Sequence, residues 1–201
     1  MIDLNSIPKS ESDKLLSSWG YDLMWDYFTC ITHAGFDNNL PVFEAATGSG
    51  RCVSLLSRFN PYIISGDYDF TSMPDVRKRV TDEYLNRVNF VRLNLEKIPF
   101  MDKSVKNIAC INTLHEVQNP VLCLKEVIRV HNGSGRLLIS DFNEEGYTVM
   151  DKLHRVKFGN LHPRGSITFN EVLEIVTGVY NRIELIKTVL NWGLVLSLKK
   201  T

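Results

Sequence analysis

A glycine-containing turn follows the first short apolar run of the chain and is the segment best suited to bind a ligand. It reads Glu44-Ala45-Ala46-Thr47-Gly48-Ser49-Gly50 and comes directly after Pro41-Val42-Phe43. Glycine tolerates a positive φ and lets a ligand approach the backbone closely. The helix expected after the turn offers free N–H groups and a positive dipole end, which suit a carboxylate or a phosphate. The turn therefore predicts a ligand site, although a plain strand-to-helix connection has the same appearance.

Two aspartates lie about twenty residues beyond the turn. Asp67 falls at the end of the next apolar run, and Asp69 follows it on the other side of Tyr68. An acidic side chain at this place can accept two hydrogen bonds from ribose hydroxyls. Either aspartate is a candidate for that role, and the alternative for each is the N-cap of the next helix.

The same segment argues against a dinucleotide. The dinucleotide-binding fingerprint requires a third glycine three residues after the second, and Val53 stands there. An acid before the glycines, such as Glu44, is also foreign to that fingerprint. A nicotinamide-dependent dehydrogenase is therefore disfavoured.

The elements that must position these residues alternate between strand and helix. Short, nearly continuous apolar runs with helices between them predict a largely parallel sheet covered on both faces. Only Leu190-Asn191 separates the last two runs, so these should pair as an antiparallel hairpin. We expect an α/β fold, a three-layer sandwich around a mostly parallel seven-stranded sheet that ends in this hairpin. The expected strands are 41–43, 62–64, 88–93, 107–111, 136–140, 182–189 and 192–199, with a turn at 132–135.

Helix signals fill the intervals between the strands. A helix should begin at Ser10 or Ser12 and run to about Ala34, where Gly35 ends it. Another should begin at Thr71 or Ser72, because Pro74 suits a first helical turn, and continue to about residue 85. The remaining helices are expected after Gly50 through residue 56 and at 121–130, 144–158 and 169–178.

Composition narrows the class of partner. The chain has 201 residues and equal numbers of basic and acidic residues, 23 each, so its net charge is zero. Nucleic-acid binders usually show a basic excess, so no nucleic-acid partner is expected, and Arg77-Lys78-Arg79 is interpreted as the solvated face of a helix. The four cysteines have no metal-ligand spacing, so no metal site is expected, and Cys110 and Cys123 should be core thiols. No signal peptide or membrane span is recognised, which predicts a cytoplasmic protein.

Four motifs in order give the chain a family resemblance. The turn at 44–50 resembles the acid-x-Gly-x-Gly-x-Gly loop of class I S-adenosylmethionine-dependent methyltransferases, with Ala46 in place of the first glycine. The segments at 94–100, 114–117 and 126–135 resemble further motifs of the same family, in particular of the methyltransferase type 11 group typified by ubiquinone/menaquinone-biosynthesis C-methyltransferases. The match covers residues 38–145 well. It covers the last fifty residues only by pattern, where the strand from Asn191 to Lys199 fits the ending of the family. The resemblance implies a Rossmann-like fold and S-adenosylmethionine as cofactor.

The resemblance also implies a role for each matched position. Glu44 would hold the amino group of the methionine part, and the loop from Ala46 and Thr47 through Gly48 and Gly50 would pass under the cofactor. Asp67 or Asp69, with Tyr68, would meet the ribose side. The residues expected around the adenine and the sulfonium are Asn94, Leu95 and Asn112. For both asparagines, satisfaction of a turn or a strand end is the alternative.

The sequence identifies the residues that would contact the methyl acceptor less specifically. Methyl transfer needs a base only if the acceptor must lose a proton, and His115 or Glu116 after the fourth strand would be that base. A structural histidine at a strand-to-helix turn is the alternative for His115. The aromatic residues Tyr21, Trp25 and Tyr27 would form part of a lid or would simply be core. The segment that shapes the acceptor pocket in this fold contains His154, His162 and Arg164.

Two functional hypotheses remain open. The first is a methyltransferase that acts on a small molecule, because the Asn/Asp-Pro-Pro-Tyr motif of amino-directed enzymes is missing and strand four ends Ile111-Asn112-Thr113-Leu114. The second is a protein of this fold that has lost activity or serves as a partner subunit, which Ala46, Asn94 and Val105-Lys106 favour. We expect one domain over 1–201, with an N-terminal helical segment (1–37), a cofactor-binding core (38–145) and acceptor-side elements (146–201), and we allow a homodimer.

Overall fold

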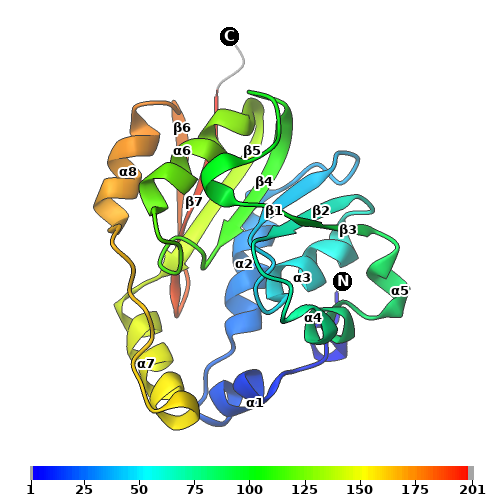
Figure 1. The fold of residues 1–201 in the computed structure, drawn as a ribbon, viewed down its shortest axis with the longest axis vertical. Coiled ribbons are helices and arrows are strands. Elements are labelled where there is room, and N and C mark those ends of the chain that lie inside the picture. Colours follow the sequence, from blue (N-terminus) through cyan, green and yellow to red (C-terminus); the bar gives the residue numbers. More distant parts are fainter. Residues whose placement is uncertain (1, 199–201) are drawn as a thin grey trace.

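A seven-stranded sheet in the order β3-β2-β1-β4-β5-β7-β6 organises the computed structural model, which describes residues 2–198 (Figure 1). The first five strands run parallel, and β7 lies antiparallel to both β5 and β6. This confirms the predicted fold class and the final hairpin. The strands are β1 (Val42–Ala45), β2 (Ile63–Asp67), β3 (Val88–Arg92), β4 (Val105–Ile111), β5 (His131–Phe142), β6 (Arg182–Lys187) and β7 (Asn191–Ser197).

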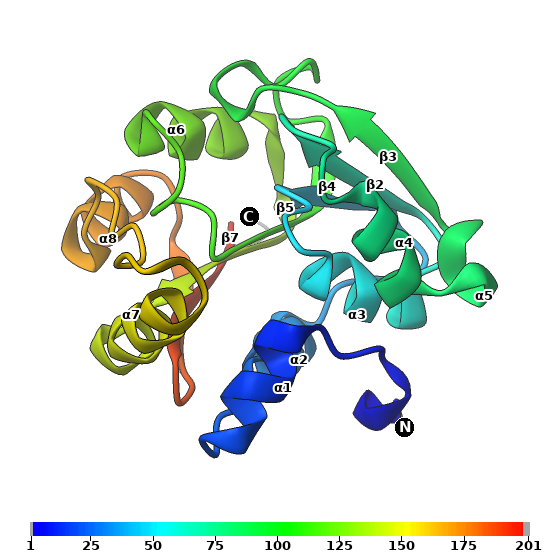
Figure 2. The ribbon, with the colours of Figure 1, turned by 60° about the horizontal axis from the view of Figure 1, so that its bottom comes forward.

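Helices cover both faces of the sheet (Figure 2). The apolar sides of α2 and α3 contribute to one buried cluster, and those of α6 and α8 contribute to a second cluster on the opposite face. The α-helices are α1 (Glu11–Ser18), α2 (Leu23–Ala34), α3 (Arg51–Phe59), α4 (Met73–Val80), α5 (Asp82–Leu85), α6 (Pro120–Val130), α7 (Glu144–Phe158) and α8 (Phe169–Thr177). Two 3-10 turns, η1 (Leu4–Ser6) and η2 (Leu95–Lys97), complete the described elements.

The strand order reverses between β1 and β4. The chain passes from β1 outward through β2 to β3 and then returns to β4 on the other side of β1. In open α/β sheets, ligands bind outside the carboxyl ends of the strands at such a reversal. The turn at 46–50 leaves β1 at this place, so the topology supports the ligand site predicted from the sequence.

Two expected helices are each broken in two. The helix expected from Ser10 to Ala34 is interrupted between α1 and α2, where Gly20 has a φ of 87°. The helix expected from residue 71 to 85 is interrupted at Thr81, whose φ is 69°. Ser10 does begin α1 with a capping box to Asp13, as an N-cap serine should.

The turn expected at 132–135 lies inside the bounds of β5. On β4, Val105 pairs with His131 and Asn107 pairs with Arg136, so residues 132–135 form an irregularity within the paired strand. Gly133 permits it with a φ of 81°. At the other end of the chain, β7 is described to Ser197, and Lys199, the last residue of the expected strand, lies outside the described residues.

Three compositional expectations meet the structure as follows. Cys110 and Cys123 are buried, as predicted for core thiols. The basic run is only partly a solvated face, because Arg79 is 4% exposed while Arg77 and Lys78 are exposed. Over residues 2–198, no helix has the length and apolar character required to cross a membrane.

Candidate functional site

A cavity of about 610 Å³ opens at the carboxyl ends of the central strands. Its volume lies within the range of small-molecule sites. Ten of the thirteen residues predicted as site residues line it, namely Ala46, Thr47, Gly48, Asp67, Tyr68, Asn94, Leu95, Asn112, His115 and Glu116. The cavity therefore joins the ends of β1, β2 and β4 with the segments that follow β3 and β4.

The turn after β1 forms the floor of the cavity. Ala46 has a φ of 76° and Gly48 a φ of 49°, so both adopt the left-handed conformation that favours glycine. A Cβ atom at Gly48 would meet nothing within 4 Å, which leaves the backbone of the turn open to a ligand. Ala46 thus adopts a backbone conformation that favours glycine, at the cost of strain.

Glu44 lies outside the lining of the cavity. Its side chain is fully buried beneath the turn, does not line the cavity, and accepts a hydrogen bond from the Ser65 hydroxyl. Burial, with a smaller contribution from the charge of Asp67, raises the pKa of Glu44 to about 8. Its Oε1 has no hydrogen-bond partner among the described residues, so the cofactor contact predicted for Glu44 stays a prediction.

Gly50 and Asp69 also lie away from the cavity. Gly50 is the N-cap of α3, and a Cβ atom there would lie 3.1 Å from Cγ1 of Val76, so this glycine permits the close packing of α3 against α4. The Asp69 carboxylate accepts hydrogen bonds from the amide and the hydroxyl of Thr71, at 3.0 and 2.6 Å. Asp69 thus stabilises its own turn, while Asp67 is the aspartate that lines the cavity.

Asp67 connects the ends of the first two strands. Its Oδ2 accepts a hydrogen bond from the Gly48 amide at 2.7 Å, and its Oδ1 accepts one from the Asp69 amide at 3.1 Å. An ionised carboxylate has about four lone-pair directions, so each oxygen can accept a further hydrogen bond from a hydroxyl. The geometry therefore favours Asp67 over Asp69 as the ribose ligand.

The segment after β3 forms the wall beside Asp67. Asn94 caps η2, and its Oδ1 accepts a hydrogen bond from the Glu96 amide at 2.9 Å. The turn role that we considered as the alternative for Asn94 is therefore present, and the oxygen keeps one lone pair for a ligand. Leu95 is buried beside it, and Tyr68 is largely exposed across the cavity. Together these side chains form an apolar surface with one amide, which suits a planar ring such as adenine.

Asn112 directly follows β4 and has an unpaired donor. Its Oδ1 accepts a hydrogen bond from the Asn191 amide group, and its φ of 50° turns the chain at this point. Its buried Nδ2 has no hydrogen-bond partner among the described residues. A buried polar group without a partner costs free energy, and Asn112 is one of the residues that line the cavity.

His115 is held rigidly at the far side of the cavity. Its Nδ1 lies 2.5 Å from Oδ1 of Asp141, and its Nε2 lies 3.0 Å from Nε2 of His162. Burial by itself would lower the pKa of His115, but the hydrogen bonds and charges of Asp141 and Glu116 outweigh it and raise the pKa to about 9. Asp141 and Glu116 therefore favour the protonated ring, and Nε2 offers a lone pair only after it has lost its proton.

Of the three aromatic residues considered for a lid, one reaches the cavity. Tyr27 of α2 is buried and lines it, together with Leu23. Tyr21 instead donates a hydrogen bond to Glu145 at 2.5 Å, and Trp25 is 55% exposed. The lid hypothesis therefore does not hold for Tyr21 or Trp25.

A buried ion-pair network supports the turn from outside. Asp13 of α1 accepts hydrogen bonds from Arg51 Nε at 2.9 Å and from Arg79 Nη2 at 2.7 Å. Arg79 Nε in turn donates to the carbonyl of Ser49 at 3.0 Å. Burial by itself would raise the pKa of Asp13, but Arg51 and Arg79 outweigh it and hold that pKa well below its usual range. The network ties α1, α3 and α4 to the ligand-binding turn.

Sequence reasoning missed part of the site. Asp141 at the end of β5 carried a detectable signal, since it is an acidic residue directly after an apolar strand. Phe142 and Met150 carried none, because apolar residues in these elements are indistinguishable from core. Further lining residues that the sequence did not predict are Ser49, Arg51, Cys52, Ile111, Thr113, Val117, Gln118 and Cys123.

Comparisons with known proteins show what this sequence and fold are similar to. Residues 43–139 match a family model described as "Methyltransferase domain". The chain is 27% identical over 155 residues to the "Ubiquinone/menaquinone biosynthesis C-methyltransferase UbiE" of Shewanella pealeana, an alignment that covers 75% of this chain and 61% of that protein. The chain thus spans less than two thirds of the length of this relative.

Solved structures share the fold. A methyltransferase from Aquifex aeolicus, described as dependent on S-adenosylmethionine, superposes with a TM-score of 0.66 at 19% identity, covering 94% of this chain and 98% of that one. The [4+2]-cyclase SpnF superposes with a TM-score of 0.61 at 14% identity, covering 82% and 58% of the respective chains. The chain is thus similar in sequence to a methyltransferase domain and to a C-methyltransferase, and similar in fold to a methyltransferase dependent on S-adenosylmethionine.

Proposed function

We propose that this chain transfers a methyl group from S-adenosylmethionine to a small-molecule acceptor. The observation that carries the proposal is the cavity at the strand-order reversal, where the open turn at Gly48, Asp67 and Asn112 line one space. The name of the Shewanella pealeana relative, a C-methyltransferase of quinone biosynthesis, supports a small-molecule acceptor.

The residues present fit the cofactor. In the proposed arrangement Asp67 accepts hydrogen bonds from the ribose hydroxyls, and the turn from Ala46 to Gly48 lies under the methionine part. Asn94, Leu95 and Tyr68 surround the adenine, where the side chain of Leu95 covers the ring. Asn112 lies at the end of the ligand that carries the sulfonium. When bound, the cofactor supplies a methyl group that is already activated, so the protein mainly orients the reactants and excludes water.

The acceptor is proposed to bind beyond Asn112. There the cavity is lined by His115 and Glu116, with Phe142 and Met150 as apolar neighbours. A mixed lining of this kind suits a partly apolar molecule that carries one polar group next to the methylated atom. His115 and Glu116 are the groups that contact this polar group: the Glu116 carboxylate can receive its proton, and the protonated His115 can balance its negative charge.

A second candidate is a protein that binds the cofactor without transferring its methyl group. Ala46 in the left-handed conformation and the engaged Asn94 oxygen depart from the pattern of the family, and both lie in the cofactor site. The cyclase SpnF has the same fold, so the fold by itself does not specify methyl transfer. The second candidate predicts binding of S-adenosylmethionine without turnover.

Finer features of the proposal follow from composition. We propose that residues 1–201 act as one domain and that the protein works in the cytoplasm without a nucleic-acid partner, alone or as a homodimer. The zero net charge supports the absence of a polyanion partner. Size-exclusion chromatography with light scattering checks the homodimer.

The experiment that tests the proposal is transfer of a labelled methyl group. The full chain is incubated with methyl-labelled S-adenosylmethionine and with phenolic, quinol and aliphatic acceptors. We expect label in one acceptor class and loss of transfer in Asn112→Ala, while Asn132→Ala, which lies at the opposite end of the sheet, transfers normally. Binding of the cofactor with no label in any class would favour the second candidate.

A further inference from the structure

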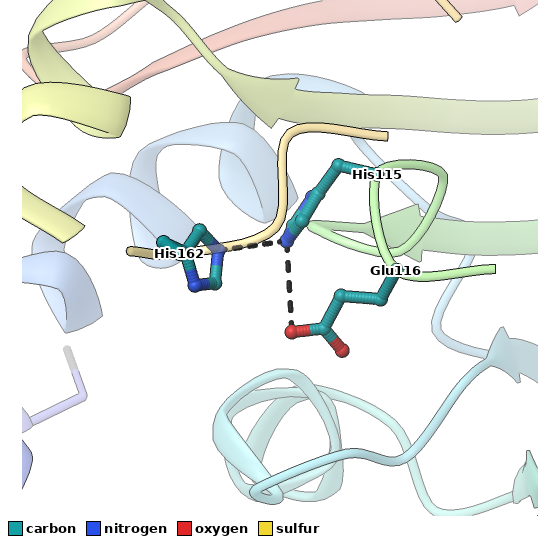
Figure 3. A group of neighbouring side chains, drawn as sticks. All are labelled: His115, Glu116 and His162. Carbon is teal, nitrogen blue, oxygen red and sulfur yellow. Dashed lines mark hydrogen bonds and ion pairs between the residues drawn. The ribbon is translucent and has the colours of Figure 1, made fainter. Parts of the chain in front are cut away.

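Three potential metal ligands meet at the acceptor side of the cavity (Figure 3). His115 and Glu116 lie on the segment that leaves β4, and His162 lies on the loop between α7 and α8. The Nε2 atom of His115 lies 3.0 Å from Nε2 of His162 and 3.6 Å from Oε1 of Glu116. All three ligand atoms lie within 4.8 Å of one another.

These separations are close to those around a metal ion. Zinc–nitrogen and zinc–oxygen bonds are about 2.0–2.2 Å long, so two ligand atoms of a tetrahedral zinc site lie roughly 3.4 Å apart. The two histidines must separate by a few tenths of an ångström, and the Glu116 side chain must close toward them. Glu116 is free to do so, because its side chain is 60% exposed at the mouth of the cavity.

The histidine rings are already oriented by partners on their far sides. Asp141 holds Nδ1 of His115 at 2.5 Å, and His154 holds Nδ1 of His162 at 2.9 Å through its own Nε2. Ligating histidines almost always have such an outer partner, most often a carboxylate or a carbonyl, which sets the tautomer and leaves the other nitrogen for the metal. Both Nε2 atoms therefore point to the same place.

The loop that carries His162 is built to reach His115. A Cβ atom at Gly165 would lie 2.6 Å from Cα of His115, so only glycine lets the loop approach this closely. The Asp151 carboxylate accepts hydrogen bonds from the His162 amide at 3.1 Å and from Arg164 at 2.8 Å, which fixes the loop on α7. The three ligands thus come from two segments that the fold holds together.

We propose that His115, His162 and Glu116 bind one first-row divalent transition-metal ion, of which Zn²⁺ and Co²⁺ are the probes. Two imidazoles and one carboxylate suit such ions, whereas Mg²⁺ prefers sites made of oxygen ligands. The spacing of the ligands hid the site from sequence reasoning, because 47 positions separate His115 from His162.

Three protein ligands leave a coordination position open, as in catalytic metal sites. All three ligand residues line the cavity, so the open position faces the space proposed for the acceptor. The ion would bind an acceptor oxygen and lower its pKa, which selects acceptors with a hydroxyl or an enolisable carbonyl next to the methylated atom. The role of the ion in activating the acceptor rests on the proposed methyl transfer, whereas the binding of the ion does not.

The test is calorimetric titration of the full, chelator-stripped chain with Zn²⁺, Co²⁺ and Mg²⁺. We expect one Zn²⁺ or Co²⁺ per chain, a visible Co²⁺ absorption band and no binding of Mg²⁺. His162→Ala should weaken binding by more than the ~10–100-fold that outer partners of metal ligands contribute. Glu116→Gln changes an exposed side chain, so it should fold normally and still weaken binding. His33→Ala, at an exposed histidine beside Glu184, should bind like the unchanged protein.

The same metal-free protein is titrated with S-adenosylmethionine. Absence of metal binding, or equal metal binding by the protein and both site variants, overturns the metal site even where S-adenosylmethionine binds. Metal binding that His162→Ala and Glu116→Gln abolish supports the site even where the cofactor fails to bind, and in that case the proposed methyl transfer alone is refuted.

Discussion

The Asp67 carboxylate accepts a hydrogen bond from the Gly48 amide, with 2.7 Å between Oδ2 and the nitrogen, and so connects the end of β2 to the turn after β1. This bond holds the open backbone of the turn next to the one acidic group of the strand-two end that lines the cavity. A ligand that spans both features must present hydroxyl groups to Asp67 and a slender chain to Gly48. S-adenosylmethionine has this shape, with a ribose in its middle and a methionine part at one end.

Ala46→Gly should stabilise the protein. Ala46 has a φ of 76°, and the left-handed conformation costs a residue with a Cβ atom roughly 1–2 kcal/mol. Glycine removes most of this cost, so the free energy of unfolding should rise by about 1 kcal/mol in urea titrations. Ala45→Gly, in the fully buried strand next to it, is the matched control and should destabilise. A loss of stability in both variants would show that Ala46 is not strained.

Glu44→Gln should change how stability depends on pH. The pKa of Glu44 is raised from its ordinary value of 4.5 to about 8 in the folded protein, so between these values the folded state keeps a proton that the unfolded state has lost. The contribution is therefore fully present below pH 4.5 and is lost as the pH rises to about 8, with a slope of up to ~1.4 kcal/mol per pH unit.

The check is the difference in unfolding free energy between the unchanged protein and Glu44→Gln, measured without cofactor from pH 5 to pH 8. We expect this difference to fall steadily as the pH rises. A constant difference over the whole interval would mean that Glu44 is ionised in the folded state, with Ser65 and its other neighbours compensating its burial.

Asp13→Asn should destabilise the protein strongly. Asp13 and Arg79 are each 5% exposed in their side chains and form an ion pair at 2.7 Å. Removing one partner of a buried ion pair typically costs about 3–5 kcal/mol, because the other charge is left without compensation. Asp75→Asn is the control, since the pair of Asp75 with Lys78 lies on the surface and should contribute less than ~1 kcal/mol. If Asp13→Asn and Asp75→Asn lowered the free energy of unfolding equally in urea titrations, the buried ion pair would not stabilise the protein as described.

Because the pKa of Asp13 is lowered, the contribution of this ion pair to stability depends on pH. Its contribution is present above the unfolded value of 3.8 and is lost as the pH falls toward the folded pKa. The stability difference between the unchanged protein and Asp13→Asn should therefore shrink only in strong acid.

Gly165→Ala should be more harmful than Gly159→Ala. Both glycines lie in the loop after α7 with positive φ, 67° and 72°, so an added Cβ atom costs similar backbone strain at each. At Gly165 the Cβ atom would also lie 2.6 Å from the backbone of His115, whereas at Gly159 it would meet nothing within 4 Å. Overpacking of this kind costs typically ~1–3 kcal/mol. Thermal unfolding checks the order, and equal melting temperatures would show that the loop does not rest on His115.

The sequence was sufficient for the architecture and for those site residues that directly follow a strand. Gly48, Asp67, Asn112 and His115 could be predicted because the carboxyl ends of parallel strands meet at one edge of a sheet. The sequence did not show that Glu44 and Gly50 lie outside the lining of the cavity. Alternate residues of a strand point to opposite sides, and the burial of a side chain depends on the helices that cover it.

The remaining misses have a tertiary origin. Thr81 has a φ of 69°, which a β-branched residue rarely adopts, so local propensity gave no reason to break the helix there. Arg79 was predicted to be solvated, because the sequence does not show that α1 brings Asp13 to it from 66 positions away. His162 likewise reaches His115 only through the fold of the loop between α7 and α8.

The most direct test of the central claim is calorimetric titration of S-adenosylmethionine into the unchanged protein, Asp67→Asn and Asp69→Asn. We predict saturable binding to the unchanged protein and affinity within about twofold of it for Asp69→Asn. Hydrogen bonds to a charged group contribute about 1.5–3 kcal/mol, so Asp67→Asn should bind roughly 10–100-fold more weakly. No binding to the unchanged protein, or equal binding by all three, would contradict the cofactor site described at Asp67 and Gly48.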